Sequence, residues 1–356
     1  MRAVTSATAS FLCSNAARLS LLCNATAGSL THQALPASAA CTASRGRMQT
    51  ILQQQRLFSS SGISAGNAGP VYLVFGATGG IGSALAHRLT SKAQSGGASP
   101  SALVLSGQHD DKLQQLQGTL KGQGEGACKV EVEAADATDP EQVEKVVRAA
   151  LSRHGRLDGV VNCIGNVAAA SALATEVQQL QQDLQVNLFT SFNIVKSSIK
   201  AMVAGDAHSS SNASNSSTAH GNDAKRRGAG GCIVLVSAAL ASHGLPNYES
   251  MSAAKAAVEG LARSAAATYA AHNIRVNCVA PGLTRTPQTK KFTKNQQVSG
   301  ASEQMHPLKE LAEPEQVASA LAFFLAPEND FITGQVLAVD GGLSTLHPHH
   351  AEEYGV

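Results

Sequence analysis

The sequence predicts an α/β domain built on a doubly wound parallel sheet. Short apolar runs alternate with segments of helical periodicity between Val71 and Val339. Parallel strands that are buried on both faces are typically continuous apolar runs, and the helices that connect them cover both faces of the sheet. A glycine-rich turn follows the first apolar run, at the place where ligands bind on such sheets.

The composition narrows the class of protein. The chain has 356 residues, of which 43% are hydrophobic and 15% charged, and its net charge is +2. These values are ordinary for a globular domain, and the near-neutral balance gives no basic footprint for nucleic acid. No apolar run approaches the roughly 18 residues of a membrane span. We therefore expect a partner that is neither a nucleic acid nor a membrane.

The cysteines and histidines do not show the spacing of a metal site or of a disulfide framework. His347, His349 and His350 cluster in a terminal tail without paired ligands elsewhere. Four cysteines lie in or beside apolar runs and are expected to be buried free thiols in a reducing compartment. These are Cys128, Cys163, Cys232 and Cys278.

Residues 1–62 differ in composition from the rest of the chain. They contain five arginines among many Ala and Ser residues, and the first acidic residue is Asp110. This composition is typical of an organelle transit peptide. The segment Arg56-Leu-Phe-Ser-Ser resembles a matrix-processing signal cut before Ser59, which favours the mitochondrial matrix over the chloroplast. A plain disordered tail is the alternative.

The first strand and the turn after it predict a dinucleotide site. The apolar run Val71–Phe75 breaks into Gly76, Gly79, Gly80 and Gly82, and a helical pattern follows. A helix N-terminus presents unpaired N–H groups and a partial positive charge, which suit a phosphate. Glycines let the backbone approach a pyrophosphate without a Cβ clash.

The remaining elements follow in order within a domain over residues 70–345. Strands are expected at 102–106, 129–134, 157–162, 231–237, 274–280 and 334–339. Helices are expected at 111–120, 140–151, 177–202 (one or two), 250–271 and 314–325. Asp139 is expected to cap the helix that opens at Pro140. Residues 204–230 are predicted to be a low-complexity, disordered insertion, 289–300 a polar loop and 346–356 a tail.

The order of motifs resembles the short-chain dehydrogenase/reductase family over about residues 70–345. The matching segments are Gly76-Ala-Thr-Gly-Gly-Ile-Gly82, Asp136, Asn162-Cys-Ile-Gly165, Asn187, Lys255, Pro281-Gly-Leu-Thr-Arg-Thr286 and Asp340-Gly-Gly342. The resemblance implies a single Rossmann-like domain with a seven-stranded sheet, NAD(P) as cofactor, and a homo-oligomer, either a dimer or a tetramer. Phe75 departs from the usual Thr before the first glycine.

By position, the resemblance implies a set of cofactor-binding residues. The glycine turn would line the pyrophosphate, Asp136 would accept from the adenine amino group, Lys255 would bind the nicotinamide ribose, and Thr286 would lie near the carboxamide. The full set is Gly76, Thr78, Gly80, Ile81, Gly82, Gln108, Asp136, Asn162, Gly165, Lys255, Pro281, Gly282 and Thr286.

The end of the second strand bears on the choice between NAD and NADP. An acidic residue there binds the ribose 2′-hydroxyl of NAD, whereas an Arg pairs with the 2′-phosphate of NADP. This chain has Ser106-Gly-Gln-His109, with neither. Because no acid repels a phosphate at that position, the sequence favours NADP, with His109 and Lys112 as candidate partners of the phosphate.

The family's chemistry uses a Tyr four residues before the Lys, where one helical turn brings the phenol next to the cation. Asn187 and Lys255 are present, but Met251 occupies the Tyr position and Ala238 the position of the carbonyl-polarising Ser. Two of the four catalytic positions are therefore altered.

Three hypotheses follow for the proton donor. Tyr248 lies seven residues before Lys255 and would share its face on a continuous helix, with Ser237 polarising the carbonyl. Alternatively the donor is His243, Ser242, Ser252 or a water held by Asn187 and Lys255. In the third hypothesis the chain binds NAD(P) without turnover, as a structural or redox-sensing protein, and Met251 is core packing.

An active enzyme would transfer a hydride between nicotinamide and a small-molecule carbonyl or secondary alcohol. Residues 287–311 would then form a substrate lid. Lys290, Lys291 and Lys294 within it would attract an anionic substrate, such as an acyl group on a phosphopantetheine carrier, unless they form an ordinary solvated loop.

Overall fold

The computed structural model describes residues 69–91, 100–123, 128–212 and 230–346. In this part of the chain seven strands form one parallel sheet in the order β3-β2-β1-β4-β5-β6-β7. The strands are β1 Val71–Phe75, β2 Ala102–Gly107, β3 Lys129–Ala134, β4 Gly159–Asn162, β5 Gly231–Val236, β6 Ile274–Pro281 and β7 Val336–Val339. The predicted doubly wound, seven-stranded, single-domain Rossmann-like fold is confirmed.

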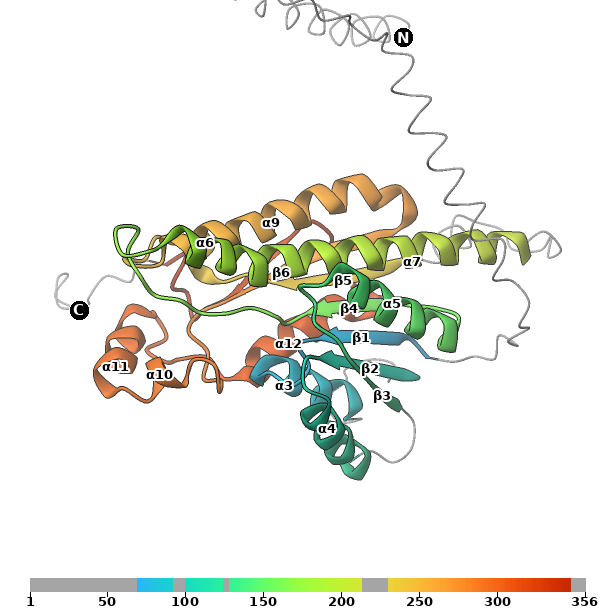
Figure 1. Cartoon of the computed structure of the whole chain (residues 1–356), viewed down its shortest axis with the longest axis horizontal. Helices are drawn as coiled ribbons and strands as arrows, with labels where there is room; N and C mark the ends of the chain where they lie inside the picture. Colours follow the sequence, from blue (N-terminus) through green and yellow to red (C-terminus); the bar gives the residue numbers. More distant parts are fainter. Residues whose placement is uncertain (1–68, 92–99, 124–127, 213–229, 347–356) are drawn as a thin grey trace, which may run out of the picture. The chain divides into compact units, whose positions relative to one another are not determined.

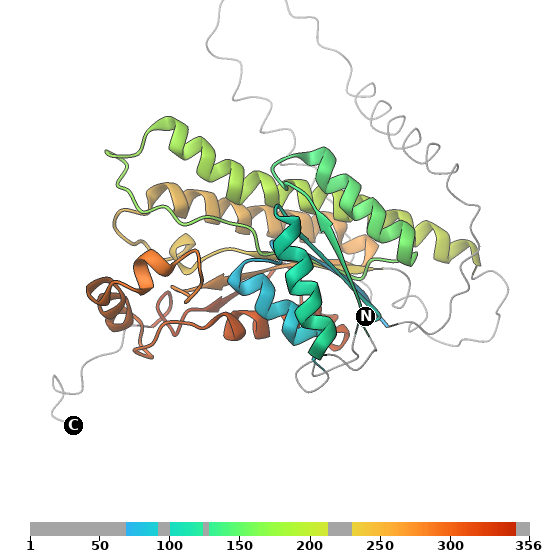
Figure 2. The ribbon, with the colours of Figure 1, turned by 60° about the horizontal axis from the view of Figure 1, so that its bottom comes forward.

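Helices cover both faces of the sheet (Figure 1). The helices are α3 Gly80–Thr90, α4 Asp110–Gln123, α5 Pro140–His154, α6 Val177–Leu184, α7 Thr190–Asn212, α9 Glu249–Tyr269, α10 Lys290–Thr293, α11 Gln296–Met305 and α12 Pro314–Leu325. One face carries α5, α7 and α9, and the other carries α3, α4 and α12. Figure 2 brings α3 and α4 in front of the strands.

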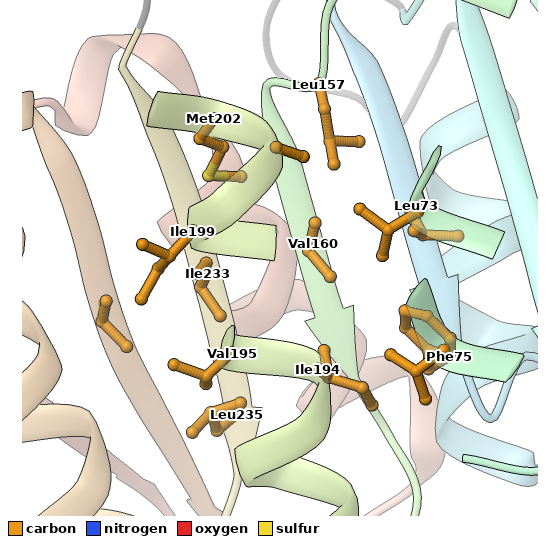
Figure 3. Close-up of a cluster of buried hydrophobic side chains, with 14 of the residues drawn as sticks. Leu73, Phe75, Leu157, Val160, Ile194, Val195, Ile199, Met202, Ile233 and Leu235 are labelled. Atoms are coloured by element: carbon orange, nitrogen blue, oxygen red, sulfur yellow. The ribbon is translucent and has the colours of Figure 1, made fainter. Parts of the chain in front are cut away.

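The core on the α7 side shows how the apolar runs become buried strands. Successive strand side chains point to opposite faces. Leu73 and Phe75 of β1 accordingly face the same side as Ile233 of β5, where Ile194 and Ile199 of α7 pack (Figure 3). Val74 and Tyr72 point to the other core, under α3 and α12. Burial of both faces explains why central strands such as β1 and β5 are continuous apolar runs.

The topological switch point of the sheet lies at β1, which has β2 on one side and β4 on the other. The chain first moves from β1 to β2 and β3, and then returns to place β4 on the other side of β1. Crossovers on opposite sides of the sheet leave a crevice beyond the carboxyl ends of these two strands. Gly76 and Cys163 are the first residues after β1 and β4, so the crevice opens at the glycine turn.

Two predictions about the polar segments differ from the structure. Residues 289–300 contain α10 and the first half of α11, so the loop prediction is wrong. Asn295 caps α11 by accepting from the amides of Gln297 and Val298, and the residues that α11 buries are Ser299 and Ser302. Because small polar side chains are buried there, the sequence shows no apolar periodicity. The predicted insertion begins later than residue 204, because α7 continues to Asn212.

Other details of the described part match the sequence. Asp139 caps α5 by accepting from the Glu141 amide. Cys232 and Cys278 are buried as expected, whereas Cys128 and Cys163 are only half-buried, and all four are free thiols. In the described ranges no helix is long and apolar enough to cross a membrane. The transit-peptide segment, residues 213–229 and the histidines His347, His349 and His350 lie outside the described residues.

Lys309, between α11 and α12, has a φ of 60°, in the left-handed region that favours glycine. We expect Lys309→Gly to raise the free energy of unfolding by about 1 kcal/mol, because glycine adopts this conformation without strain. The matched control is Lys145→Gly, at an exposed position inside α5, which should lower it by about 1 kcal/mol. Urea unfolding measures both changes, and equal losses in the two variants would contradict the prediction.

Candidate active site

The turn after β1 is built closely enough to require its glycines. Gly76 has a φ of 73°, and its carbonyl accepts from the Gly79 amide at 3.1 Å. A Cβ on Gly82 would lie 2.3 Å from the Gly76 oxygen, and one on Gly80 would lie 2.9 Å from the Thr286 side chain. Gly79 gives α3 no side-chain cap. The first turn of α3 therefore keeps N–H groups for a phosphate, and the residues fit a dinucleotide there.

The space beside this turn is large enough for phosphate groups. A cavity of about 530 Å³ is lined by Thr78, Gly79 and Gly80, by Ser83 and Arg88 of α3, and by Pro287. Ile81 begins the buried face of α3 and packs against the core. The structure thus brings the turn, Thr78 and Thr286 together.

Gln108 and Asp136 lie together at the ends of β2 and β3. Asp136 Oδ1 accepts from the Thr138 amide at 2.9 Å and from the Thr138 hydroxyl at 2.8 Å. The backbone hydrogen bond from Thr138, with smaller contributions from the Thr138 hydroxyl and Gln108, lowers the pKa of Asp136. The carboxylate is therefore held ionised, as an acceptor at this edge of the sheet. His109 and Lys112 are exposed on the neighbouring turn of α4.

Asn162 is buried and shapes the loop after β4. Its Oδ1 accepts from the Ile164 amide at 2.9 Å, and its Nδ2 donates to Ser191 Oγ at 3.0 Å. Its side chain thus holds the loop that carries Gly165 and does not itself face open space.

Gly165, Asn187 and Lys255 meet at one point. A Cβ on Gly165 would lie 2.9 Å from Asn187 Oδ1 and 3.0 Å from Lys255 Nζ. Asn187 sits in a π-helical turn, Gln185–Phe189, between α6 and α7. Lys255 Nζ donates to the Val236 carbonyl at 3.0 Å. The missing side chain at Gly165 keeps a polar space open between an amide oxygen and an amine.

Lys255 is 5% exposed, and burial lowers its pKa to about 8. The thiols of Cys163 and Cys278 act weakly in the opposite direction. The amine therefore changes its protonation close to neutral pH, which suits either the binding of ribose hydroxyls or proton transfer.

Ser237 and Met251 do not form the expected polar pair. Ser237 is 2% exposed, and its hydroxyl is bonded to Glu259 Oε1 at 2.9 Å and to the Lys255 carbonyl at 3.2 Å. Met251 is also 2% exposed, with its sulfur 3.7 Å from Asn187 Nδ2. Neither side chain offers a free polar group to a substrate.

Tyr248 is the N-cap residue of α9, with φ −131° and ψ 23°. This backbone is not helical, so the assumption of a continuous helix from Tyr248 to Lys255 fails at its first residue. Burial raises the pKa of the phenol, which weakens it as an acid. Its role as a donor stays a hypothesis.

The other candidate donors differ in how far they are engaged. Ser242 Oγ donates to the Ala239 carbonyl at 3.3 Å, and Ser252 Oγ to the Leu240 carbonyl at 2.8 Å. His243 is half-buried in the same loop. The two hydroxyls are thus committed to backbone carbonyls, and His243 stays a candidate.

The end of β6 faces the α11 segment. A Cβ on Gly282, which follows Pro281, would lie 2.7 Å from His306 Nε2. Among the described residues this buried nitrogen has no hydrogen-bond partner. Thr286 is held by Thr289, whose hydroxyl accepts from the Thr286 amide at 3.0 Å.

A second cavity, of about 670 Å³, lies between the loop after β4, α6 and α10. Its polar lining is mainly amides, among them Asn166 and Gln179, with Lys291 at its edge. The ammonium of Lys291 is 4.8 Å from the centre of the Phe292 ring. Of the three lysines expected to meet an anionic substrate, Lys291 is the one that lines this cavity.

The sequence analysis missed Asp183, Asn166 and Ser250. Asp183 is completely buried one helical turn before Asn187 and hydrogen-bonds to the other two. The spacing of four residues between Asp183 and Asn187 is the signal that could have found it, because it places both on one face.

Comparisons with known proteins agree with this geometry. The family model described as enoyl-(acyl carrier protein) reductase matches residues 76–225 and 215–344. The 3-oxoacyl-[acyl-carrier-protein] reductase FabG of Thermotoga maritima is 30% identical over 77% of this chain and 98% of its own length. The cis-4-hydroxycyclohexanecarboxylate dehydrogenase of Sinomonas cyclohexanicum is 33% identical over 78% and 97%.

Solved structures share the fold. A short-chain dehydrogenase/reductase from Mycobacterium ulcerans superposes with a TM-score of 0.67, at 26% identity over 80% of this chain and 93% of its own. A variant of the actinorhodin polyketide ketoreductase, determined with NADPH, gives 0.64 at 22% identity over 78% and 98%. Together with the family model, these matches show that the chain belongs to the short-chain dehydrogenase/reductase family of oxidoreductases.

Proposed function

We propose that this protein is an NAD(P)-dependent oxidoreductase that transfers a hydride between nicotinamide and a carbonyl or secondary alcohol. The observation that carries the proposal is the meeting of Gly165, Asn187 Oδ1 and Lys255 Nζ beside the glycine turn. The similarity to the Thermotoga maritima reductase and the Sinomonas cyclohexanicum dehydrogenase supports this class of reaction.

Each residue has a distinct task in this proposal. The bound nicotinamide supplies or accepts the hydride. The first turn of α3 holds the pyrophosphate, and Asp136 accepts from the adenine amino group. Lys255 donates to the ribose hydroxyls from a position fixed by the Val236 carbonyl. Met251 excludes water from the space that the family's Tyr would fill.

The proton then moves through a water held between Asn187 Oδ1 and Lys255 Nζ. Of the three donor hypotheses, this version of the second is favoured, because Ser237 is committed to Glu259 and Tyr248 lies outside the helix. In reduction, the carbonyl oxygen takes a proton from this water, and Lys255 replaces it at a pH below its pKa of about 8.

NADP is the proposed preferred cofactor. Gln108, His109 and Lys112 are exposed at the ribose end of the site, and no acid follows β2 directly. The first turn of α4 also carries Asp110 and Asp111, so the preference depends on which charges the 2′-phosphate meets. Calorimetric titration with NADPH and NADH compares the two.

A homo-oligomer in the mitochondrial matrix completes the proposal. Phe189 and Phe192 are about half exposed at the start of α7, and burial of such rings between subunits would remove them from water. Light scattering of the purified full chain gives the oligomeric state, and a fluorescent fusion gives the compartment.

A second candidate function is cofactor binding without turnover. The buried Met251, which has no transferable proton, favours it. In that case the protein would act as a structural or redox-sensing subunit.

Gly165→Ala tests the cofactor site. The new Cβ would press on Asn187 Oδ1, which is held by hydrogen bonds, and on Lys255 Nζ, the end of a flexible side chain, so Lys255 should be displaced while the fold survives. We expect NADPH affinity to fall roughly tenfold, about 1.4 kcal/mol. The control Gly260→Ala lies on α9, where an added Cβ meets nothing within 4 Å, and should leave affinity unchanged. Fluorescence titration measures both, and no loss in Gly165→Ala would refute the site.

Met251→Tyr separates the two candidate functions. An enzyme that lacks only an efficient proton donor should gain at least tenfold in kcat, because general acid catalysis contributes roughly 10²–10⁴-fold. Met251→Phe, an aromatic residue without a hydroxyl, is the matched control. Turnover is read from nicotinamide absorbance on a panel of carbonyls. If wild type and Met251→Tyr are equally inert while binding NADPH, the binding-only function is supported.

The protonation of Lys255 predicts a pH dependence of binding. Its pKa is about 8, so the ammonium that donates to the ribose hydroxyls is present below pH 8 and lost above it. We expect NADPH affinity to fall between pH 7 and pH 9. In Lys255→Met the affinity should be lower and flat over the same window. A wild-type affinity that rises with pH would contradict the assignment.

A further inference from the structure

Asp183 is a buried acid in the described structure that the proposed chemistry does not use. It is 0% exposed at the end of α6. Its Oδ1 accepts from Asn166 Nδ2 at 2.8 Å and Gln179 Nε2 at 3.0 Å, and its Oδ2 accepts from Ser250 Oγ at 2.6 Å. Its neighbours are therefore neutral donors, and the carboxylate acts purely as an acceptor.

An acceptor at one end dictates the direction of the amides that follow. A carboxylate oxygen accepts hydrogen bonds, so Asn166 must turn its amino group toward Asp183. The oxygen of the Asn166 amide then faces Asn187 and accepts from Asn187 Nδ2. Asn187 Nδ2 also donates to the Asp183 backbone carbonyl at 2.9 Å.

Because the amino group of Asn187 donates to the Asn166 side chain and to the Asp183 carbonyl, the amide oxygen of Asn187 faces away from both acceptors, toward Gly165. Asn187 Oδ1 accepts a hydrogen bond from the backbone N–H of Asn166 at 3.3 Å. A Cβ built on Gly165 would lie 2.9 Å from this oxygen and 3.0 Å from Lys255 Nζ, so the two groups border the same small space. This series of hydrogen bonds thus begins at the Asp183 carboxylate, which can only accept, and ends opposite the Lys255 ammonium, which can only donate.

We propose that Asp183 is a positioning residue that sets the direction of the Asn166 and Asn187 amides, so that an oxygen faces Lys255. Reversal of both amides would place an amino group there, with its positive end toward the lysine. The proposal rests on the proposed function only where it links Lys255 to the cofactor. The order of the amides and the charge of Lys255 are properties of the protein alone.

The surroundings of Lys255 separate this effect from others. The groups that face it are the Val236 carbonyl on β5, the Cys163 thiol after β4 and the Cys278 thiol on β6. One turn further along α9, Glu259 is held by Ser237. None of these groups contacts Asp183, so a change at Asp183 reaches Lys255 through the amides.

Asp183→Asn in the full chain tests the proposal. The new amide can donate as well as accept, which allows the two following amides to reverse. The titration midpoint of Lys255 is read by NMR on protein labelled with ¹³C at lysine Cε, with Lys255→Arg to assign the signal. We expect the midpoint to fall by about one pH unit, because an amino group in place of an oxygen disfavours the ammonium.

Ser250→Ala is the matched control. It removes a hydrogen bond to the same carboxylate, which joins α6 to α9, but leaves the order of the amides intact. Its midpoint should stay within about 0.3 units of wild type. An equal fall in Ser250→Ala, or no fall in Asp183→Asn, would overturn the proposal.

Asn166→Ala covers the case in which Asp183→Asn does not fold. It removes the side-chain link from Asp183 Oδ1 through Asn166 to Asn187 Nδ2, and it leaves the hydrogen bonds of Asn187 to the Asp183 carbonyl and the Asn166 backbone N–H in place. A lowered Lys255 midpoint supports the proposal, and an unchanged one overturns it. The measurement needs no cofactor, so a midpoint shift in a protein that fails to bind NADPH would reject the proposed function and keep this inference.

Discussion

The burial of one lysine is the constraint on which the site depends. Lys255 lies among strand ends and is almost completely removed from water, where a charged amine is costly unless acceptors surround it. The fold supplies the Val236 carbonyl directly and the Asn187 oxygen across a small polar space. A pKa of about 8 results mainly from burial, which disfavours the charge, while the thiols of Cys278 and Cys163 act in the opposite direction.

Backbone geometry, more than side-chain variety, creates that polar space. The π-helical turn Gln185–Phe189 interrupts the register between α6 and α7 and directs Asn187 inward. Gly165 has no side chain to fill the gap between Asn187 and Lys255. Asn162 holds the loop that carries Gly165 by bonding to both its own strand end and α7. The loop after β4 and the π-helical turn therefore converge on the amine of Lys255.

Much of the fold could be predicted from the sequence, because a strand that is buried on both faces is a short run of consecutive apolar residues. The bounds of β1, β3 and α12 match the apolar pattern residue for residue. The exception, α11, buries Ser299 and Ser302, so its amphipathic pattern is not apolar. The glycine turn was equally predictable, because the tight contacts at Gly76 and Gly82 admit only glycine.

The direction of polar side chains was not predictable from spacing. Ser237 is at the expected end of β5, but its hydroxyl donates to the carboxylate of Glu259 on α9 and so does not face the candidate site. Tyr248 is at a plausible separation from Lys255, but the helix begins one residue after it. Asp183 lies in a run of Gln and Leu that resembles a solvated helix, and its burial depends on Ser250 and Asn166 from distant segments.

Met251 marks the point at which the two proposed functions separate. In the proposed function the acceptors around Lys255 would support cofactor binding whether or not a proton is transferred, so Asn187 and Lys255 would serve both proposed functions equally. A thioether accepts hydrogen bonds weakly and has no proton to give, and here it rests against the Asn187 amino group. Met251 itself therefore supplies no proton, and in the proposed reaction the proton reaches the carbonyl through the water beside Asn187 and Lys255.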